Sequence, residues 1–253
     1  MKSATVPILA AIVAQLGLGL AVFIANPQRK SNQCFLLLSL VAVGWLGSLY
    51  GLFTTRDPAI AAVCIREASA AGAFILTALN LLRLSIRWRH EGWGEILRRS
   101  WGWLVLTLGT VVLCQTNSFL QGARMPQHLG AALSAPVPVY GNAVYLYAFL
   151  FVTAIIALIV GSWRDLRQTT GSEHAELAFL LVGATTILAV SLLVAFILDF
   201  FVEESQSIWI APFRAILFSL VVAYAIARRK IMEVGFFVRR ATKPSHKVPV
   251  GTT

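Results

Sequence analysis

Long apolar stretches alternate with short polar segments along most of this chain. A helix that spans a bilayer needs about 20 mainly apolar residues, and the stretches are continuously apolar, which favours helices over a β-barrel. The predicted spans are Val6–Ala25, Cys34–Phe53, Ala59–Leu82, Trp103–Leu120, Tyr140–Trp163, Leu177–Phe201 and Ile208–Ala227. The pattern therefore predicts an all-α polytopic membrane protein, with a seven-transmembrane-helix bundle over residues 1–227 and a short basic tail over 228–253.

The composition supports a membrane protein. Hydrophobic residues make up 58% of the chain and charged residues 13%, whereas a soluble domain carries about 25% charged residues. A chain this apolar would expose far too much hydrocarbon surface in water. We therefore expect no soluble catalytic domain, and any function has to work through the bundle, its loops or the tail.

The net charge of +10 is distributed unevenly. If the N-terminus faces outside, 16 of the 21 basic residues fall on the inner side, while the 11 acidic residues divide six to five. This asymmetry follows the positive-inside rule and predicts that the N-terminus is outside and the C-terminus is cytoplasmic. It also favours contact with anionic inner-leaflet lipids and argues against a nucleic-acid partner.

Several membrane chemistries lack the residues that they need. No histidine and no lysine lies inside a predicted span, which excludes an intramembrane haem pair, a metal cluster and a retinal Schiff base. We expect no cofactor, no metal and no enzymatic activity. Cys64 and Cys114 lie at similar depth, so a disulfide between them stays open, but buried free thiols are favoured.

Charged side chains inside a bilayer are costly and are usually paired or functional. Two interpretations stay open for those in the outer half of the predicted bundle. They form an outward-facing ligand site, roofed by aromatic side chains such as Tyr140 and Tyr145, or they form ion pairs that stabilise the bundle. The predicted site consists of Arg66, Glu67, Gln115, Asn117, Asp199, Trp209 and Arg214.

Two long connections also carry expectations. The outer loop Gln121–Val139 contains Pro136 and Pro138, which favour extended or turn backbone. The inner connection Arg83–Trp101 is basic and rich in tryptophan. It is expected to anchor the third and fourth spans, with a separate interfacial helix as the less favoured alternative.

The end of the seventh span carries a recognisable motif. Tyr-Ala-Ile-Ala at 224–227 is followed by Arg-Arg-Lys, Ile-Met-Glu-Val and, after four residues, Arg239-Arg240. This run resembles the exit from the seven-helix sensor region of bacterial histidine kinases, and the stretch around Arg164–Arg167 is similar as well. Glu233 stands where that family usually has Asp, and Lys230 where it has an apolar residue or Arg. We expect none of the PAS, GAF, dimerisation or ATPase domains of that family within residues 1–253.

The resemblance implies a membrane sensor or receptor-like module in a bacterial inner membrane. A ligand would bind in its outer half, and the seventh helix and the tail would signal to a cytoplasmic partner, without kinase activity in this chain. The tail residues implied in signalling are Arg228, Arg229, Lys230, Arg239 and Arg240. Two alternatives stay open: a small transporter or channel that uses the same charged residues, and a structural subunit of a membrane complex. The sequence predicts no particular oligomeric state.

Overall fold

The computed structural model describes residues 5–125 and 136–170, together with His174, Leu177, Ala178, Leu181, Val182 and Thr185. This part is mostly helical. Its five long helices are α1 (Thr5–Ala25), α2 (Lys30–Thr54), α3 (Pro58–Arg87), α4 (Trp93–Cys114) and α5 (Ala143–Gln168). Each is long and apolar enough to cross a membrane. The sixth predicted span lies largely, and the seventh span and the tail lie entirely, outside the described residues.

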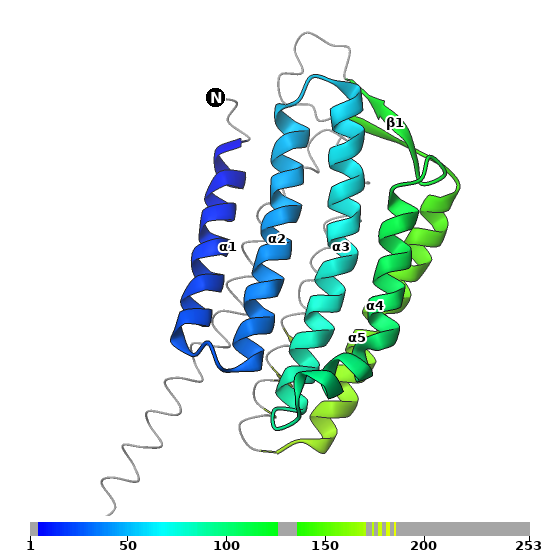
Figure 1. The fold of residues 1–253 in the computed structure, drawn as a ribbon. Coiled ribbons are helices and arrows are strands. Elements are labelled where there is room, and N and C mark those ends of the chain that lie inside the picture. Colours follow the sequence, from blue (N-terminus) through cyan, green and yellow to red (C-terminus); the bar gives the residue numbers. More distant parts are fainter. Residues whose placement is uncertain are drawn as a thin grey trace, which may run out of the picture.

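Consecutive helices run in opposite directions (Figure 1). Short turns connect the helices from α1 to α4, whereas a longer connection that contains a small hairpin leads from α4 to α5. α2 packs between α1 and α3, and α3 also contacts α4, α5 and the first strand of a small hairpin. α3 is therefore the central element of the described bundle. Its start is fixed locally, because the Asp57 carboxylate accepts a 2.8 Å hydrogen bond from the backbone N–H of Ala59 and Pro58 occupies the first helical position.

The prediction for the fourth span is wrong at both ends. α4 begins at Trp93, ten residues before the predicted start, and ends at Cys114, six before the predicted end. The early turns are charged but helical, since Glu95 pairs with arginines three and four residues later at 2.8 and 2.7 Å. The connection between α3 and α4 is thus reduced to residues 88–92, and the separate interfacial helix considered for Arg83–Trp101 is not formed.

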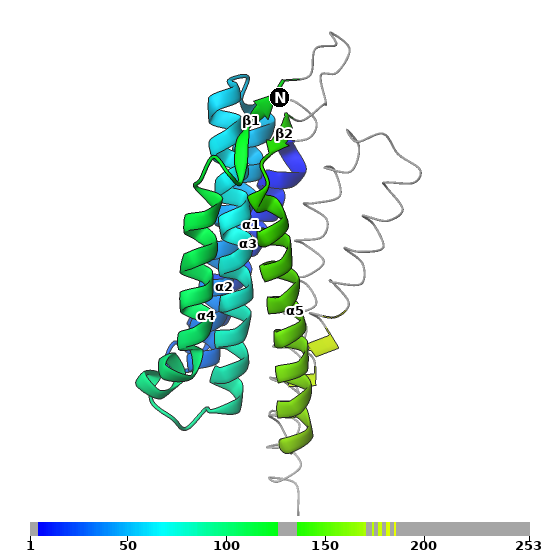
Figure 2. The same ribbon diagram turned by 90° about the vertical axis from the view of Figure 1, so that its right-hand side faces the viewer.

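The connection after α4 contains a two-stranded antiparallel hairpin, β1 (Leu120–Arg124) and β2 (Val137–Tyr140). The expected extended backbone is confirmed for these two strands, and this short hairpin departs from the otherwise helical fold that was predicted. Pro138 is compatible with the hairpin because both strands of a two-stranded sheet are edge strands. Figure 2 shows the hairpin at the end of the bundle where α1 starts.

The fifth helix lies three to five residues further along the chain than predicted, from Ala143 to Gln168 instead of Tyr140 to Trp163. Arg164 and Asp165, which lie beyond the predicted end of this span, are therefore helical. Just before α5, a Cβ at Gly141 would overlap the carbonyl oxygen of Ser118, so this close backbone crossing requires glycine. All three cysteines are free; Cys34 and Cys114 are buried, whereas Cys64 is only partly buried.

Candidate functional site

Four of the seven residues predicted to form the outer site come together. Arg66 and Glu67 lie in the first half of α3, and Gln115 and Asn117 lie in the turn that follows α4. Each α3 residue makes a hydrogen bond to one residue of the turn. The other three predicted site residues, Asp199, Trp209 and Arg214, lie outside the described residues.

Arg66 connects α3 to both the turn and the hairpin. Its Nη2 atom donates 2.8 Å hydrogen bonds to the side-chain oxygen of Asn117 and to the backbone carbonyl of Leu120, the first residue of β1. The Nε atom of Arg66 is also buried, and it has no hydrogen-bond partner among the described residues. Leaving a buried donor unsatisfied costs about 1–3 kcal/mol, and more for a charged group. An additional acceptor at Nε would therefore be strongly favoured.

The second contact is weaker and more exposed. Gln115 donates a hydrogen bond from Nε2 to the Glu67 carboxylate at 3.1 Å, and both side chains face outward. Within the described part of the chain, neither Arg66 nor Glu67 takes part in a salt bridge. Hydrogen bonds between charged groups and neutral amides join α3 to the turn here. Among the described residues, Arg66 and Glu67 therefore do not support the interpretation in which ion pairs stabilise the bundle.

The polar contacts rest on an aromatic and apolar floor. Phe119 is buried, and its ring lies 5.8 Å from the ring of Tyr140, edge-on, and 5.2 Å from that of Tyr147. The Tyr147 hydroxyl donates a 3.0 Å hydrogen bond to the carbonyl of Ser69 on α3. Tyr140 therefore contributes to the floor beneath the hairpin. Tyr145 does not, because its side chain is 77% exposed at the start of α5.

A partly buried ion pair at the opposite end of α3 was not predicted. Nε of Arg83 lies 3.5 Å from Oδ2 of Asp165 on α5, and the two side chains are 14% and 21% exposed. The guanidinium packs directly on Gly161, where a Cβ would overlap it. The signal in the sequence that could have indicated this ion pair was the position of two opposite charges just beyond the predicted ends of the third and fifth spans.

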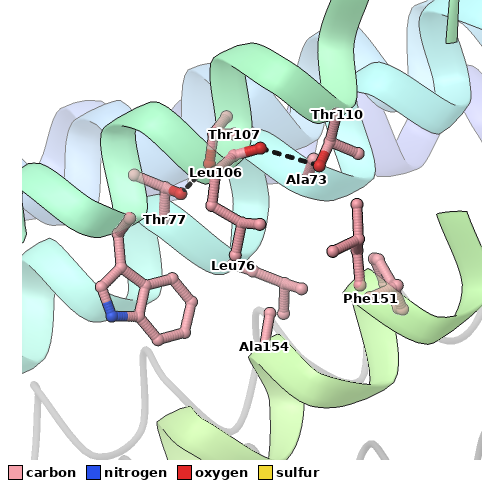
Figure 3. A pocket seen from close by; sticks show the side chains of 10 residues that line it. Ala73, Leu76, Thr77, Leu106, Thr107, Thr110, Phe151 and Ala154 are labelled. Carbon is pink, nitrogen blue, oxygen red and sulfur yellow. Dashed lines mark hydrogen bonds between the residues drawn. The ribbon is translucent and has the colours of Figure 1, made fainter. Parts of the chain in front are cut away.

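A second set of unpredicted polar contacts lies between α3 and α4. The hydroxyls of Thr77 and Thr107 share a hydrogen bond, and Nδ2 of Asn80 donates to the Ser100 hydroxyl at 3.3 Å. Figure 3 shows Thr77 and Thr107 beside a small cavity that Phe151 of α5 also lines. The cavity measures about 10 Å³, which is close to the minimum space for one water molecule. These contacts join helices and leave no room for a ligand between them.

Comparison with known proteins does not place the chain in a family. No protein-family model matches the chain, and no curated protein matches its sequence. The resemblance to histidine-kinase sensor regions rests mainly on residues 224–240, outside the described part, and stays a prediction.

Proposed function

We propose that this chain is a membrane-embedded, receptor-like sensor that binds an anionic ligand at its outer end through Arg66. The observation that carries the proposal is the partly satisfied guanidinium. Two of its hydrogen bonds fix the turn and the hairpin to α3, while the buried Nε has no partner among the described residues. A carboxylate or phosphate oxygen would suit this donor, since arginine binds such groups strongly and directionally.

The same guanidinium offers a route from binding to a change in structure. A ligand at Nε would compete for, or reinforce, the contacts of Arg66 with Asn117 and Leu120. It would thereby alter the relative stability of arrangements in which the hairpin is held against α3. Binding shifts such an equilibrium only by the difference in affinity between the two states. Asp199, Trp209 and Arg214 are proposed to complete the site.

The orientation of the bundle is part of the proposal. The turns at residues 26–29 and 88–92 and the end of α5 lie at one end of the described helices (Figure 1). Nine of the twelve lysine and arginine residues in the described ranges lie at this end, and three lie at the other: Arg56, Arg66 and Arg124. The positive-inside rule then supports an outer N-terminus and an outer hairpin.

The remaining steps follow the resemblance of the tail. Seven helices in a bacterial inner membrane would place the C-terminus in the cytoplasm. The seventh helix and the basic residues from Arg228 to Arg240 would pass the change to a cytoplasmic signalling protein. The chain itself would carry no catalytic activity. The two alternatives are a transporter or channel and a structural subunit of a membrane complex. The tests below distinguish both from a receptor.

Co-purification tests the signalling half of the proposal. The full-length chain is captured from its native membranes, and bound proteins are identified by mass spectrometry. A signalling kinase or response protein that is lost when Arg239 and Arg240 are changed to Gln supports the receptor. Recovery of the chain alone, or only with transport components, contradicts it and directs attention to flux measurements in proteoliposomes.

Thermal stability in the presence of small carboxylates and phosphates tests the ligand half. Wild type should be stabilised by at least one member of the panel, and Arg66→Ala should lose that stabilisation. Arg56→Ala is the matched control, because Arg56 is an exposed arginine at the same end, outside the site. An equal response of all three proteins would show that Arg66 does not bind the ligand.

A further inference from the structure

A polar cavity lies at the opposite end of the bundle from Arg66. It measures about 280 Å³ and is enclosed by the α1–α2 turn, the start of α2 and the end of α3. This volume is close to the lower limit of small-molecule sites, roughly 300–1,000 Å³. Among the described residues that line it, three are cationic and none is acidic: Arg29, Lys30 and Arg89. The cavity therefore has the size and the charge to hold a small anionic group.

The start of α2 opens into this cavity. Lys30 and Ser31 are its first two residues, both line the cavity, and the helix has no side-chain cap. The first backbone N–H groups of a helix have no partner within the helix and carry a partial positive charge. Such a helix start binds anions readily, phosphate included. Here the start of α2 lies beside the cationic residues that line the cavity, and the Ser31 hydroxyl adds a further donor.

Lys30 also joins the start of α2 to the segment that follows α3. Its Nζ donates a hydrogen bond to the carbonyl of Arg89 at 3.3 Å and another to the carbonyl of Glu91. These carbonyls follow the C-terminal end of α3, where the helix dipole is negative. The ammonium group thereby covers two backbone acceptors beside the cavity, and every charged side chain among the described lining residues is cationic.

We propose that this cavity binds a single phosphate group, as the headgroup of an anionic phospholipid or as a free phosphate compound. The proposal does not depend on the function proposed for the outer end. It goes beyond a general attraction between a basic surface and acidic lipids, because it assigns one site with defined residues. The cavity lies at the basic end of the bundle, which the positive-inside rule places at the inner leaflet.

Native mass spectrometry of the purified full-length chain tests the proposal. The protein in detergent is titrated with phosphatidylglycerol and, separately, with phosphatidylcholine of the same acyl chains. The test variants are Arg89→Gln and Arg29→Gln/Arg89→Gln. The control, Arg98→Gln/Arg164→Gln, removes the same charge as the double variant from exposed arginines at the same end, outside the cavity. Arg89 is itself exposed, so its single variant should fold even if the double variant does not.

We expect wild type to retain one phosphatidylglycerol in preference to phosphatidylcholine. The double variant should lose about tenfold in affinity for the anionic lipid, Arg89→Gln should lose less, and the control should stay close to wild type. A parallel thermal-stability titration with inorganic phosphate, against chloride at equal ionic strength, distinguishes the sources. If phosphate stabilises the protein and neither lipid is preferred, the ligand is a free phosphate compound. If phosphatidylglycerol is retained and phosphate does not stabilise the protein, the ligand is the lipid headgroup.

Two results would overturn the proposal. One is an equal loss of lipid in the cavity variants and in the control, which would show that the attraction is spread over the basic end. The other is the absence of both lipid preference and phosphate stabilisation in wild type.

Discussion

Arg66 on α3 donates a 2.8 Å hydrogen bond to the side-chain oxygen of Asn117, a residue 51 positions further along the chain. The same nitrogen also donates to the carbonyl of Leu120. Removing the Asn117 side chain therefore breaks one of the two bonds, whereas removing the Arg66 side chain breaks both and also removes the unpartnered Nε. The two substitutions distinguish a structural role of the guanidinium from a role in binding.

Asn117→Ala should lower the free energy of unfolding by about 1 kcal/mol, the net worth of one hydrogen bond, and should keep the ligand response. Arg66→Ala should abolish the response while the protein stays folded and monodisperse by size-exclusion chromatography. Thermal melting with and without the stabilising anion measures both effects. If Arg66→Ala fails to fold, or melts earlier with its ligand response intact, Arg66 is a structural residue and the binding interpretation is wrong.

Glu67→Gln separates charge from hydrogen bonding at the neighbouring contact. Glutamine keeps an oxygen that can accept from Gln115 Nε2, so stability should change by no more than about 0.5 kcal/mol. Removing a negative charge next to Arg66 should at the same time tighten binding of an anion, because like charges repel. Titration of the anion against melting temperature measures this. Weaker binding in Glu67→Gln would indicate that the carboxylate contacts the ligand directly.

The hydrophobic pattern was sufficient to predict where the five described helices lie, including both ends of α1, but it failed where charged residues continue a helix. Hydropathy places a boundary at the first cluster of charges, but arginine and glutamate are good helix formers. α3 therefore continues to Arg87, and α4 begins before Glu95. The hairpin was not visible because Gln121, Gly122 and Ala123 have weak strand preferences. It forms because the chain has to return from α4 to α5 over the Phe119 floor.

The contacts of Arg66 and Glu67 could be anticipated in part because charge inside an apolar span is a strong signal. Depth along the helices grouped these two residues with Gln115 and Asn117, and hydrogen bonds join them in the structure. It did not indicate which side chains pair, since pairing depends on rotation about each helix axis. The cavity lined by Arg29, Lys30 and Arg89 was not predicted, for a different reason. The sequence showed that these residues are basic, but only the packing of the α1–α2 turn beside the end of α3 brings them around one cavity.

The inner ion pair predicts a measurable coupling between α3 and α5. An exposed pair is worth up to about 1 kcal/mol, and breaking a buried one costs about 3–5 kcal/mol. The partly buried pair of Arg83 and Asp165 should lie between these limits, so Arg83→Ala should cost roughly 2 kcal/mol. In a double-mutant cycle with Asp165→Ala, the double variant should lose less stability than the sum of the two single variants. Strict additivity would contradict an energetic coupling.

Gly161→Ala tests the same contact from its other side. An added methyl group would overlap the Arg83 guanidinium, so the arginine has to leave its position and Asp165 loses its partner. Gly161→Ala should therefore destabilise the protein and should do so much less when Arg83 is already alanine. Gly102→Ala is a suitable control, because it is a helical glycine with nothing within 4 Å of an added Cβ. Equal losses from Gly161→Ala with and without Arg83 would show that the crowding involves another group.

The hydroxyl pair between α3 and α4 allows a test that changes polarity without changing shape. Thr77→Val leaves the buried Thr107 hydroxyl without its interhelical partner, and Thr107→Val does the reverse. Each should cost about 0.6 kcal/mol, the average for hydrogen bonds between transmembrane helices. Valine at both positions replaces two polar groups by apolar groups of the same shape, which is nearly neutral when no group is left unsatisfied. The double variant should thus be more stable than either single variant in unfolding titrations. A double variant that loses the sum of both single effects would show that each hydroxyl acts independently, through its own helix rather than across the interface.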